Sequence, residues 1–221
     1  AALPGKAPFN LLPYPVQIMR KGFLVIISGP SGSGKSTICR KLRHQDASLR
    51  YSVSCSTRPR RPSEIEGTHY HFLSLPEFRR KARGGAFLEW AEVHENLYGT
   101  PREAIDRAVR GGEVILLDID VQGAESIRRQ RRDAVTIFLL PPTWGSLRRR
   151  LRLRRDTHDT MRTRLVNARK ELKYTQQYTY WVINDSLPTA VKQIEAIILA
   201  ERLRGDRQSL EGTRLAALIR G

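Results

Sequence analysis

The stretch FLVIISGPSGSGKS, residues 23–36, decides the fold. Residues 23–27 form a continuous apolar run, which is typical of a parallel strand buried on both faces of a sheet. Residues 29–36 fit the pattern G-x-x-x-x-G-K-S/T, and residues 37–43 that follow have a helical pattern. A buried strand, a glycine-rich turn and a helix in this order predict a phosphate-binding loop.

The loop residues have distinct expected roles. Glycines allow backbone N–H groups to turn toward a phosphate, and the start of the following helix adds positive potential. Lys35 is expected to reach the β- and γ-phosphate oxygens and to be catalytic, and Ser36 to ligate Mg²⁺. The expected ATP-binding residues of this segment are Gly29, Pro30, Ser31, Gly32, Ser33, Gly34, Lys35, Ser36 and Thr37.

The rest of the chain alternates apolar runs with helical stretches. Apolar runs recur at residues 113–118, 135–140 and 181–184. Helix starts are expected at Ser74 and at a capping box spanning Thr100 and Glu103, and a last helix covers about 188–204. This alternation predicts an α/β fold of the P-loop NTPase type, with a parallel sheet flanked by helices.

Two segments do not show this alternation of apolar runs and helical stretches. Residues 51–98 hold short strand candidates of mixed polarity, which predict a small mixed-β subdomain inserted into the core. Residues 1–20 carry prolines at positions 4, 8, 13 and 15, which predict a weakly ordered N-terminal extension. We expect residues 1–18 to be an added segment, an upstream extension or the remainder of a removed leader, and to be dispensable for activity.

The composition excludes several classes of protein. The chain has 221 residues, 40% of them hydrophobic, and only two cysteines, Cys39 and Cys55, so it is neither disordered nor a disulfide scaffold. The cysteine usage favours a reducing, cytoplasmic location. No apolar run reaches the roughly 18 residues that a membrane span needs, so no membrane partner is expected.

The charge predicts anionic partners. Lys and Arg number 39 against 22 Asp and Glu, for a formal net charge of +17. Phosphate groups and nucleic acid both fit such an excess. Because no nucleic-acid module is recognisable and aromatic residues make up only 7%, we expect no specific nucleic-acid partner, only weak adhesion at low salt.

Two carboxylates follow the apolar run 113–117. Asp118 and Asp120 are two residues apart, and on a strand they would project to the same side. A phosphate-binding loop needs an acidic partner on a neighbouring strand to orient the metal and its waters, so Asp118 is expected to contact Mg²⁺ through water.

Several further segments, in order, are similar to the motifs of guanylate kinases. They are SCSTRPRRPSE at 54–64, GTHYHF at 67–72, FLEWA at 87–91, NLYGTP at 96–101, LDIDVQG at 117–123, PP at 141–142 and IND at 183–185. The resemblance spans about residues 22–203. The chain departs from the family pattern at His69, Glu95 and Leu97, which stand where the family usually has Asp, Gly and Tyr.

The resemblance implies a site for GMP. Arg58 and Arg61 would hold its phosphate, and a carboxylate at Glu89 would accept from the guanine N–H donors, which adenine lacks. Arg58 would also be catalytic. The implied GMP-binding residues are Ser54, Arg58, Arg61, Glu64, Tyr70, Glu89, Tyr98, Thr100, Asp118 and Asp120.

An arginine-rich stretch resembles the mobile lid of the family. Residues 148–173 hold eleven Lys and Arg against three acidic residues. The resemblance implies that Arg150 and Asn184 contact adenine. It also implies that Arg154 and Arg164 are catalytic residues near the phosphates, with Arg155 as the alternative to Arg154. The implied domains are the core (21–53, 101–145 and 161–204), a GMP-binding subdomain (54–100), a lid (146–160) and a C-terminal tail (205–221).

The implied activity is transfer of the γ-phosphoryl group of Mg·ATP to GMP, and to dGMP, giving ADP and GDP. Transfer would be direct and in line, without a phosphoenzyme. Two alternatives stay open at this point. One is a guanylate-kinase-like binding module without catalysis, and the other is a P-loop kinase for a different phosphorylated acceptor, such as a ribose phosphate.

Overall fold

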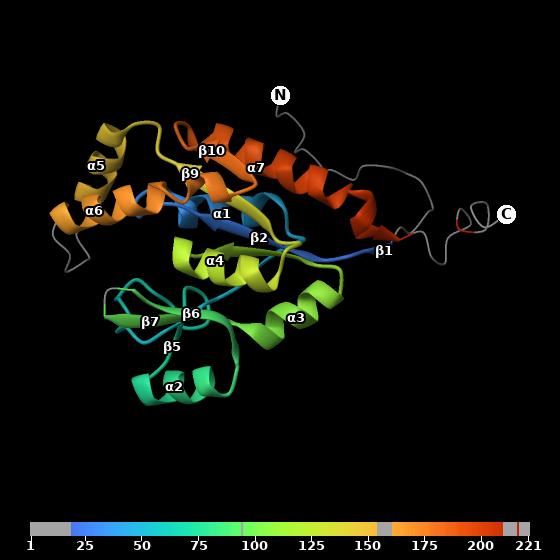
Figure 1. Ribbon diagram of the computed structural model, residues 1–221, viewed down its shortest axis with the longest axis horizontal. Helices are drawn as coiled ribbons and strands as arrows, with labels where there is room; N and C mark the ends of the chain where they lie inside the picture. The colour runs from blue at the N-terminus through green and yellow to red at the C-terminus, as the bar shows by residue number, and fades with distance from the viewer. Residues whose placement is uncertain (1–18, 94, 154–160, 210–215, 217–221) are drawn as a thin grey trace, which may run out of the picture.

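The central feature is a five-stranded parallel sheet (Figure 1). The computed structural model describes residues 19–93, 95–153, 161–209 and 216. The strands, in the order β10-β9-β2-β8-β3, are β10 (Tyr180–Ile183), β9 (Val135–Leu140), β2 (Phe23–Ser28), β8 (Val114–Asp118) and β3 (Leu49–Tyr51). Every neighbouring pair is parallel, which confirms the predicted fold class.

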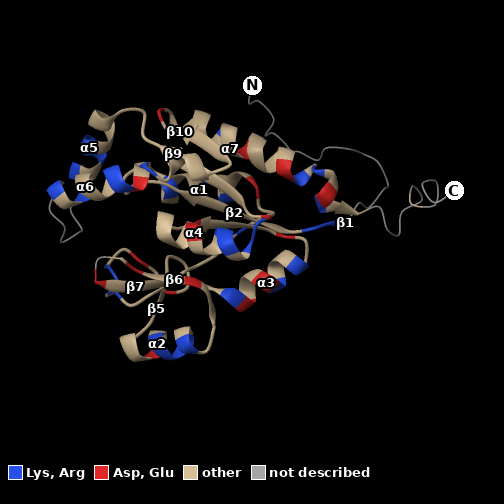
Figure 2. Ribbon diagram, viewed as in Figure 1, with Lys and Arg blue, Asp and Glu red and all other residues tan. Residues whose placement is uncertain are grey.

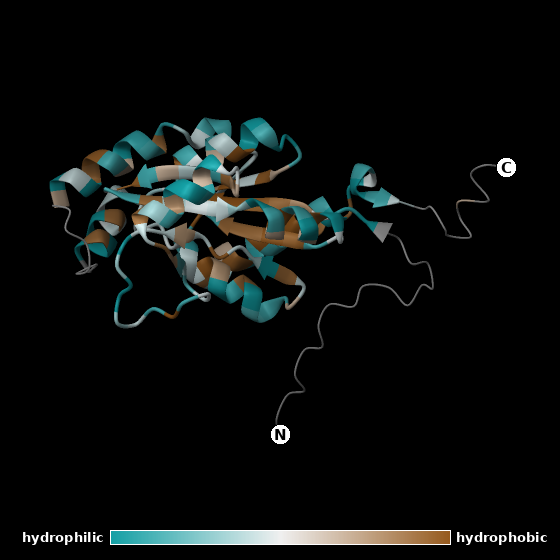
Figure 3. Cartoon of the chain, turned by 90° about the horizontal axis from the view of Figure 1, so that it is seen from below, coloured by the Kyte–Doolittle hydropathy of each residue, from teal (hydrophilic) through white to brown (hydrophobic). Residues whose placement is uncertain are grey.

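Helices cover both faces of this sheet because alternate residues of each strand point to opposite sides. Val25 of β2 belongs to one buried cluster, and Ile26 to the other. The first cluster includes residues of α1 (Lys35–Gln45) and α7 (Leu187–Arg202), and the second includes residues of α3 (Arg102–Arg110) and α4 (Val121–Gln130). Figure 3 shows the hydrophobic strands enclosed between more polar helices.

A second, four-stranded sheet of order β5-β4-β7-β6 forms the predicted mixed-β unit. Its strands are β4 (Cys55–Ser56), β5 (His71–Phe72), β6 (Phe87–Val93) and β7 (Asn96–Pro101), accompanied by α2 (Leu75–Arg83). Phe78 and Phe87 stack with their ring centroids 4.5 Å apart in its small core. In Figure 1 this sheet lies below the main one, beside α4.

Two helices, α5 (Trp144–Leu153) and α6 (Met161–Leu172), pack side by side at one end of the main sheet (Figure 1). Leu147 and Leu151 of α5 and Ala168 of α6 are fully buried between them. Both helices carry many cations (Figure 2).

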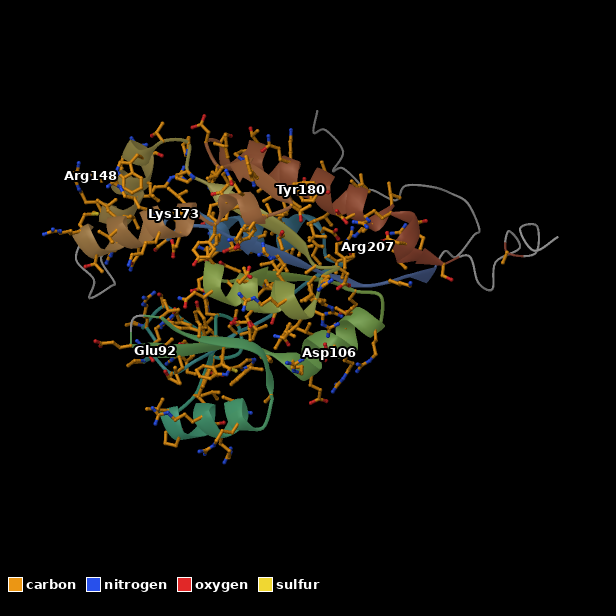
Figure 4. The ribbon with its side chains drawn as sticks, in the orientation of Figure 1. Glu92, Asp106, Arg148, Lys173, Tyr180 and Arg207 are labelled. Carbon is orange, nitrogen blue, oxygen red and sulfur yellow. The ribbon has the colours of Figure 1, made fainter. Side chains whose placement is uncertain are left out.

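The chain near the two termini forms a small antiparallel pair that the sequence did not predict. β1 (Met19–Arg20) pairs with β11 (Gln208–Ser209), although residues 19–20 were expected to be weakly ordered. The Arg207 guanidinium lies 4.0 Å from the centroid of the Phe23 ring and donates to the Asp133 carbonyl over 2.7 Å. Figure 4 shows Arg207 and Tyr180, whose side chains both contact the buried Glu201.

One helix start agrees with the sequence and one does not. The Ser74 hydroxyl accepts from the Glu77 N–H, as expected for the cap of α2. The capping box at Thr100 is wrong, because Pro101 occupies the cap position of α3 and makes no side-chain hydrogen bond there. Thr100 lies in β7, where its buried hydroxyl donates to Glu89 instead.

Local ion pairs compensate half of the charge of the arginine run at 128–132, since the run has four arginines and two carboxylates pair with it. Arg128 and Arg129 both contact Glu125, and Arg131 contacts Asp106.

In the described parts of the chain, the helices are all too short or too polar to cross a membrane.

Candidate functional site

The glycine-rich loop follows β2 and leads into α1, as the sequence predicts. Gly29, Gly32 and Gly34 all have positive φ, at 139°, 84° and 102°. At Gly34 a Cβ would also lie only 2.4 Å from Asn184 Nδ2, so both the conformation and the close approach require glycine. The loop is thereby kept open for a phosphate at the start of α1.

Lys35 and Ser36 lie at the first turn of α1. Lys35 Nζ donates to the carbonyl of Gly29 over 2.7 Å, so the ammonium group lies across the loop. The Ser36 hydroxyl donates to Asp118 Oδ2 over 2.6 Å. Hydroxyl and carboxylate oxygens of this kind fit Mg²⁺, which usually keeps several waters and takes phosphate oxygens for its remaining ligands.

Ser36 and Asp118 together suit a metal ion that takes most of its other ligands from phosphate oxygens and water. Among the described residues, no three His, Cys, Asp or Glu side chains gather as a complete metal cage. Two protein oxygens beside a phosphate loop are the arrangement that P-loop proteins use for Mg²⁺.

A cavity of about 490 Å³ opens beside the loop. It is lined by Gly32, Gly34, Lys35, Ser36, Thr37, Arg150, Asn184, Asp185 and Leu187. Asn184 is buried, and its Nδ2 donates to the Ser33 carbonyl over 2.7 Å. Arg150 donates to the Asn184 carbonyl over 2.9 Å. Both residues that were predicted to contact adenine, Arg150 and Asn184, therefore line this cavity. Each also donates a hydrogen bond to a backbone carbonyl beside it.

Of the arginines predicted to lie near the phosphates, the structure describes Arg164 alone. Arg164 is half-buried in α6 and donates to the Leu151 carbonyl over 3.0 Å. Arg154 and Arg155 lie outside the described residues. Arg148, Arg149 and Arg152 line a separate hollow at the start of α5.

Glu171 of α6 is a residue that the sequence analysis missed. It is the single acidic residue of α6, and its carboxylate accepts a hydrogen bond from the Ser31 backbone and lies within electrostatic reach of Lys35. Burial raises its pKa above the ordinary value. Its position in a helix otherwise rich in cations was the only signal in the sequence.

In the segment that connects β4 and β5 of the second sheet, Arg58 and Glu64 form a bidentate ion pair. The two guanidinium nitrogens lie 2.7 and 2.5 Å from the two carboxylate oxygens, and both side chains are about 10% exposed. The hydrogen bonds from Arg58, and a further one from the Arg61 N–H, lower the pKa of Glu64 to about 2. Glu64 therefore stays ionised and fixes the guanidinium plane of Arg58.

Two tyrosines lie beside this pair. The Arg58 guanidinium is 4.9 Å from the ring centroid of Tyr70, and the rings of Tyr70 and Tyr98 meet edge to face at 5.9 Å. Burial, and secondly the charge of Asp118, raises the pKa of Tyr70 to about 12. Its hydroxyl is thus protonated at neutral pH and able to donate. The structure brings together Arg58, Arg61, Glu64, Tyr70 and Tyr98, which are five of the residues that the resemblance implies for GMP binding.

A buried carboxyl group lies further along the same sheet. The Thr100 hydroxyl donates to Glu89 Oε1 over 2.5 Å across the β6–β7 pair, and both residues are buried. Burial, and secondarily the charge of Asp120, raises the pKa of Glu89 to about 7. A Cβ at Gly123 would lie 2.8 Å from Glu89 Oε2, so α4 approaches the carboxyl group through a glycine.

Asp120 lies near this carboxyl group at the start of α4, and Ser54 lies just before β4 in the same four-stranded sheet unit. The expectation that Asp118 and Asp120 share a strand is wrong, because β8 ends at Asp118 and Asp120 caps α4 by accepting from the Gly123 N–H over 2.9 Å. The direction of the Asp120 side chain is therefore set by the start of α4 and not by the alternation of a strand. Ser54 precedes β4, and its carbonyl accepts from the His71 N–H over 2.9 Å.

Asp118 connects the two halves of the site. It accepts from Ser36 at the phosphate loop, and its charge is the second cause of the raised pKa of Tyr70 beside Arg58. A phosphate loop at the end of a central parallel strand, together with a separate cradle of arginine and tyrosine, suits a protein that binds two phosphorylated ligands.

Comparison with known proteins identifies the family. The chain belongs to the guanylate kinase family, whose model, described as guanylate kinase, matches residues 21–201. It is 50% identical over 196 residues to a guanylate kinase of Agrobacterium fabrum, covering 88% of this chain and 89% of that protein. A guanylate kinase of Symbiobacterium thermophilum is 43% identical over 185 residues, covering 83% and 88% of the two chains.

A solved structure has the same fold. The crystal structure of guanylate kinase from Anaplasma phagocytophilum superposes with a TM-score of 0.76 and 32% identity, covering 90% of this chain and 95% of that one. The sequence resemblance and the fold class stated above are thereby confirmed.

Proposed function

We propose that this chain transfers the γ-phosphoryl group of ATP to GMP, giving ADP and GDP. It is an ATP:GMP phosphotransferase. The observation that supports this most strongly is the buried Glu89–Thr100 pair in the same cradle as Arg58, opposite an intact phosphate loop. Membership of the guanylate kinase family supports the same activity.

The donor nucleotide is assigned to the loop at residues 29–36 and to the cavity beside it. Backbone N–H groups of the loop and Lys35 hold the phosphates, and Arg150 and Asn184 face the base. Ser36 would hold Mg²⁺, and Asp118, its hydrogen-bond partner, would orient the waters of the metal. Mg²⁺, when bound, neutralises charge that develops on the β- and γ-phosphate oxygens.

The acceptor phosphate is assigned to Arg58, Arg61, Tyr70 and Tyr98. Arginine is suited to this because its fork of N–H donors matches two phosphate oxygens. Glu64 keeps Arg58 in the orientation that the phosphate requires. No side chain has to act as a strong base, since the attacking phosphate oxygen of GMP is already anionic.

The guanine base is assigned to Glu89, with Ser54, Thr100 and Asp120 completing its site. Ionised Glu89 accepts from the N1 and N2 donors of guanine. Adenine lacks that pair of donors, so AMP would leave a buried carboxylate unsatisfied, at a cost of about 1–3 kcal/mol or more. The same pocket accommodates dGMP, because the proposed contacts go to the base and the phosphate.

The remaining contacts are assigned to the lid. Arg164 neutralises charge on the transferred phosphoryl group, and Arg154, which lies outside the described residues, is assigned the same role. A single arginine in this position contributes roughly 10³–10⁵ in rate in related phosphoryl transfers.

The two alternatives lack support of this kind. A catalytically silent module has no use for the Lys35 and Ser36–Asp118 arrangement, which is complete. A kinase for a ribose phosphate has no use for Glu89 and Thr100.

We further propose a cytoplasmic location, which the two free, buried cysteines Cys39 and Cys55 support.

An acceptor screen tests this proposal. ADP formation from Mg·ATP is measured with GMP, dGMP, AMP, CMP, UMP and ribose 5-phosphate. We expect fast turnover with GMP and dGMP and little with the others. Tight GMP binding without ADP formation would select the silent module, and preference for ribose 5-phosphate would select the other kinase.

A further inference from the structure

The helices α5 and α6 hold the phosphate loop from the side. A Cβ at Gly32 would lie 3.1 Å from Leu151 Cδ2 and 3.4 Å from Leu147 Cδ1, so α5 packs directly on the loop. Leu147 and Leu151 in turn pack on Ala168 of α6. The loop conformation therefore depends on both helices.

Glu171, near the C-terminal end of α6, adds a polar contact to this packing. Its carboxylate accepts a hydrogen bond from the Ser31 backbone. One of its oxygens, Oε2, is buried and has no hydrogen-bond partner among the described residues. A half-satisfied buried carboxylate beside a phosphate-binding loop has no role in the mechanism above.

The charges that face Glu171 come from two other elements. Lys35 of α1 attracts the carboxylate, and Asp120 at the start of α4 repels it. Lys35 Nζ also donates to the Gly29 carbonyl, so the ammonium group contacts the loop while its charge acts on Glu171. The charge of Lys35 is the larger of the two effects that favour the ionised carboxylate, the other being the hydrogen bond from Ser31.

We propose that Glu171 is a positioning residue for the donor nucleotide, which holds Ser31 of the phosphate loop against α6 and takes up a proton when the triphosphate binds. The inference rests on the proposed function, since it requires ATP at residues 29–36. It adds a residue that acts through the loop rather than on the reacting atoms.

The physical reason is competition for Lys35. A bound triphosphate attracts the ammonium group and places several negative charges near Glu171. Both changes disfavour the ionised carboxylate and raise its pKa further. The proton comes from solvent, joins the carboxylate, and leaves a neutral carboxyl group that still accepts from the Ser31 N–H.

This arrangement predicts a sign for the pH dependence. A group whose pKa rises on binding takes up protons between its free and bound pKa values, so affinity for the triphosphate falls as pH rises through that window. Titration of the nucleotide itself contributes equally in the wild type and in a variant, and cancels between them.

Two substitutions separate the two parts of the proposal. Glu171→Gln removes the charge but keeps an acceptor for Ser31, and Glu171→Ala removes both. We expect the glutamine variant to lose the extra proton uptake while binding as tightly as the wild type or more tightly at pH 8. The alanine variant should bind about fivefold more weakly than the glutamine variant, the usual effect of one lost hydrogen bond.

The experiment is calorimetric titration with the Mg²⁺ complex of a non-hydrolysable ATP analogue. Titrations in buffers of different ionisation enthalpy give the number of protons taken up by the wild type, both Glu171 variants and Glu103→Gln. Glu103 is an exposed control on α3, with a side chain 84% exposed. Circular dichroism checks folding, and the glutamine variant alone decides the proton question if the alanine variant does not fold.

Three outcomes are distinguishable. Proton uptake by the wild type and Glu103→Gln, but not by Glu171→Gln, supports the proposal. Equal proton uptake in the wild type and Glu171→Gln, or equal affinity of the glutamine and alanine variants, overturns it. A wild-type protein that does not bind the analogue at all would overturn the proposed function instead.

Discussion

The Ser36 hydroxyl donates to Asp118 Oδ2 over 2.6 Å, which joins residues 82 positions apart. The contact exists because β2 and β8 pair in parallel, with Ile27 opposite Asp118. Two strands of one sheet therefore place the first turn of α1 beside the end of β8. This relationship connects the phosphate loop to the edge of the sheet that faces the acceptor cradle.

Replacing Asp118 tests the metal role. Asp118→Asn keeps the shape of the side chain and an acceptor for Ser36, but it removes the charge that orients Mg²⁺ and its waters. We expect turnover to fall by about 10²-fold or more, and the Mg²⁺ concentration for half-maximal rate to rise. Steady-state kinetics over a range of Mg²⁺ concentrations measures both, with Asp206→Asn as an exposed control. Unchanged Mg²⁺ dependence would exclude Asp118 from the metal site.

The raised pKa of Glu89 predicts proton release when GMP binds. Its pKa is about 7 in the free protein, and guanine N–H donors favour the ionised form, so the pKa falls on binding. Affinity for GMP should weaken as pH falls below about 7. Calorimetry in several buffers measures the proton number, and Glu89→Gln should release fewer protons than the wild type. The sign is opposite to that expected for the triphosphate at Glu171.

Arg58 is expected to act on GMP and not on ATP. Arg58→Ala removes a bidentate, charge-assisted donor and should raise the KM for GMP by about 10–100-fold, with the KM for ATP little changed. Arg60→Ala is a matched control in the same basic turn, since Arg60 donates to the backbone carbonyl of Glu64 over 2.8 Å, whereas Arg58 donates to its carboxylate. An effect of Arg58→Ala confined to ATP would show that the two nucleotide sites are assigned the wrong way round.

A departure from the family pattern has a measurable cost. Glu95 stands where the family usually has Gly, and it has a positive φ of 63°. Glu95→Gly removes a strain of about 1–2 kcal/mol but adds unfolded-state entropy of about 0.4–1 kcal/mol. We expect the free energy of unfolding to rise by about 0.5–1 kcal/mol in denaturant titrations. Glu92→Gly, in the extended strand β6, should lower it, and a similar loss at both positions would contradict the account.

The sequence predicted the parts of the fold that local patterns encode. Buried parallel strands are continuous apolar runs, so residues 23–27 and 135–140 were recognisable, and the loop at 29–36 has a fixed pattern. The capping box at Thr100 failed because β6 pairs with β7 and directs that hydroxyl to Glu89. The contact of Glu171 with Ser31 depends on how α6 packs, which no local pattern specifies.

Long-range pairing limited the prediction elsewhere too. Two-residue strands such as Met19–Arg20 and Gln208–Ser209 carry no periodicity, and they form only because the two ends of the described chain meet beside Arg207. Asp120 was placed on a strand because the strand pattern was continued beyond Asp118, where β8 ends. Asp120 instead caps α4.

The most direct test follows a radioactive γ-phosphate of ATP in the presence of the purified chain, Mg²⁺ and GMP. We predict that the label appears in GDP, that transfer requires Mg²⁺, and that AMP in place of GMP yields little labelled diphosphate. Label released as inorganic phosphate, or retained in ATP while GMP binds, would contradict the account.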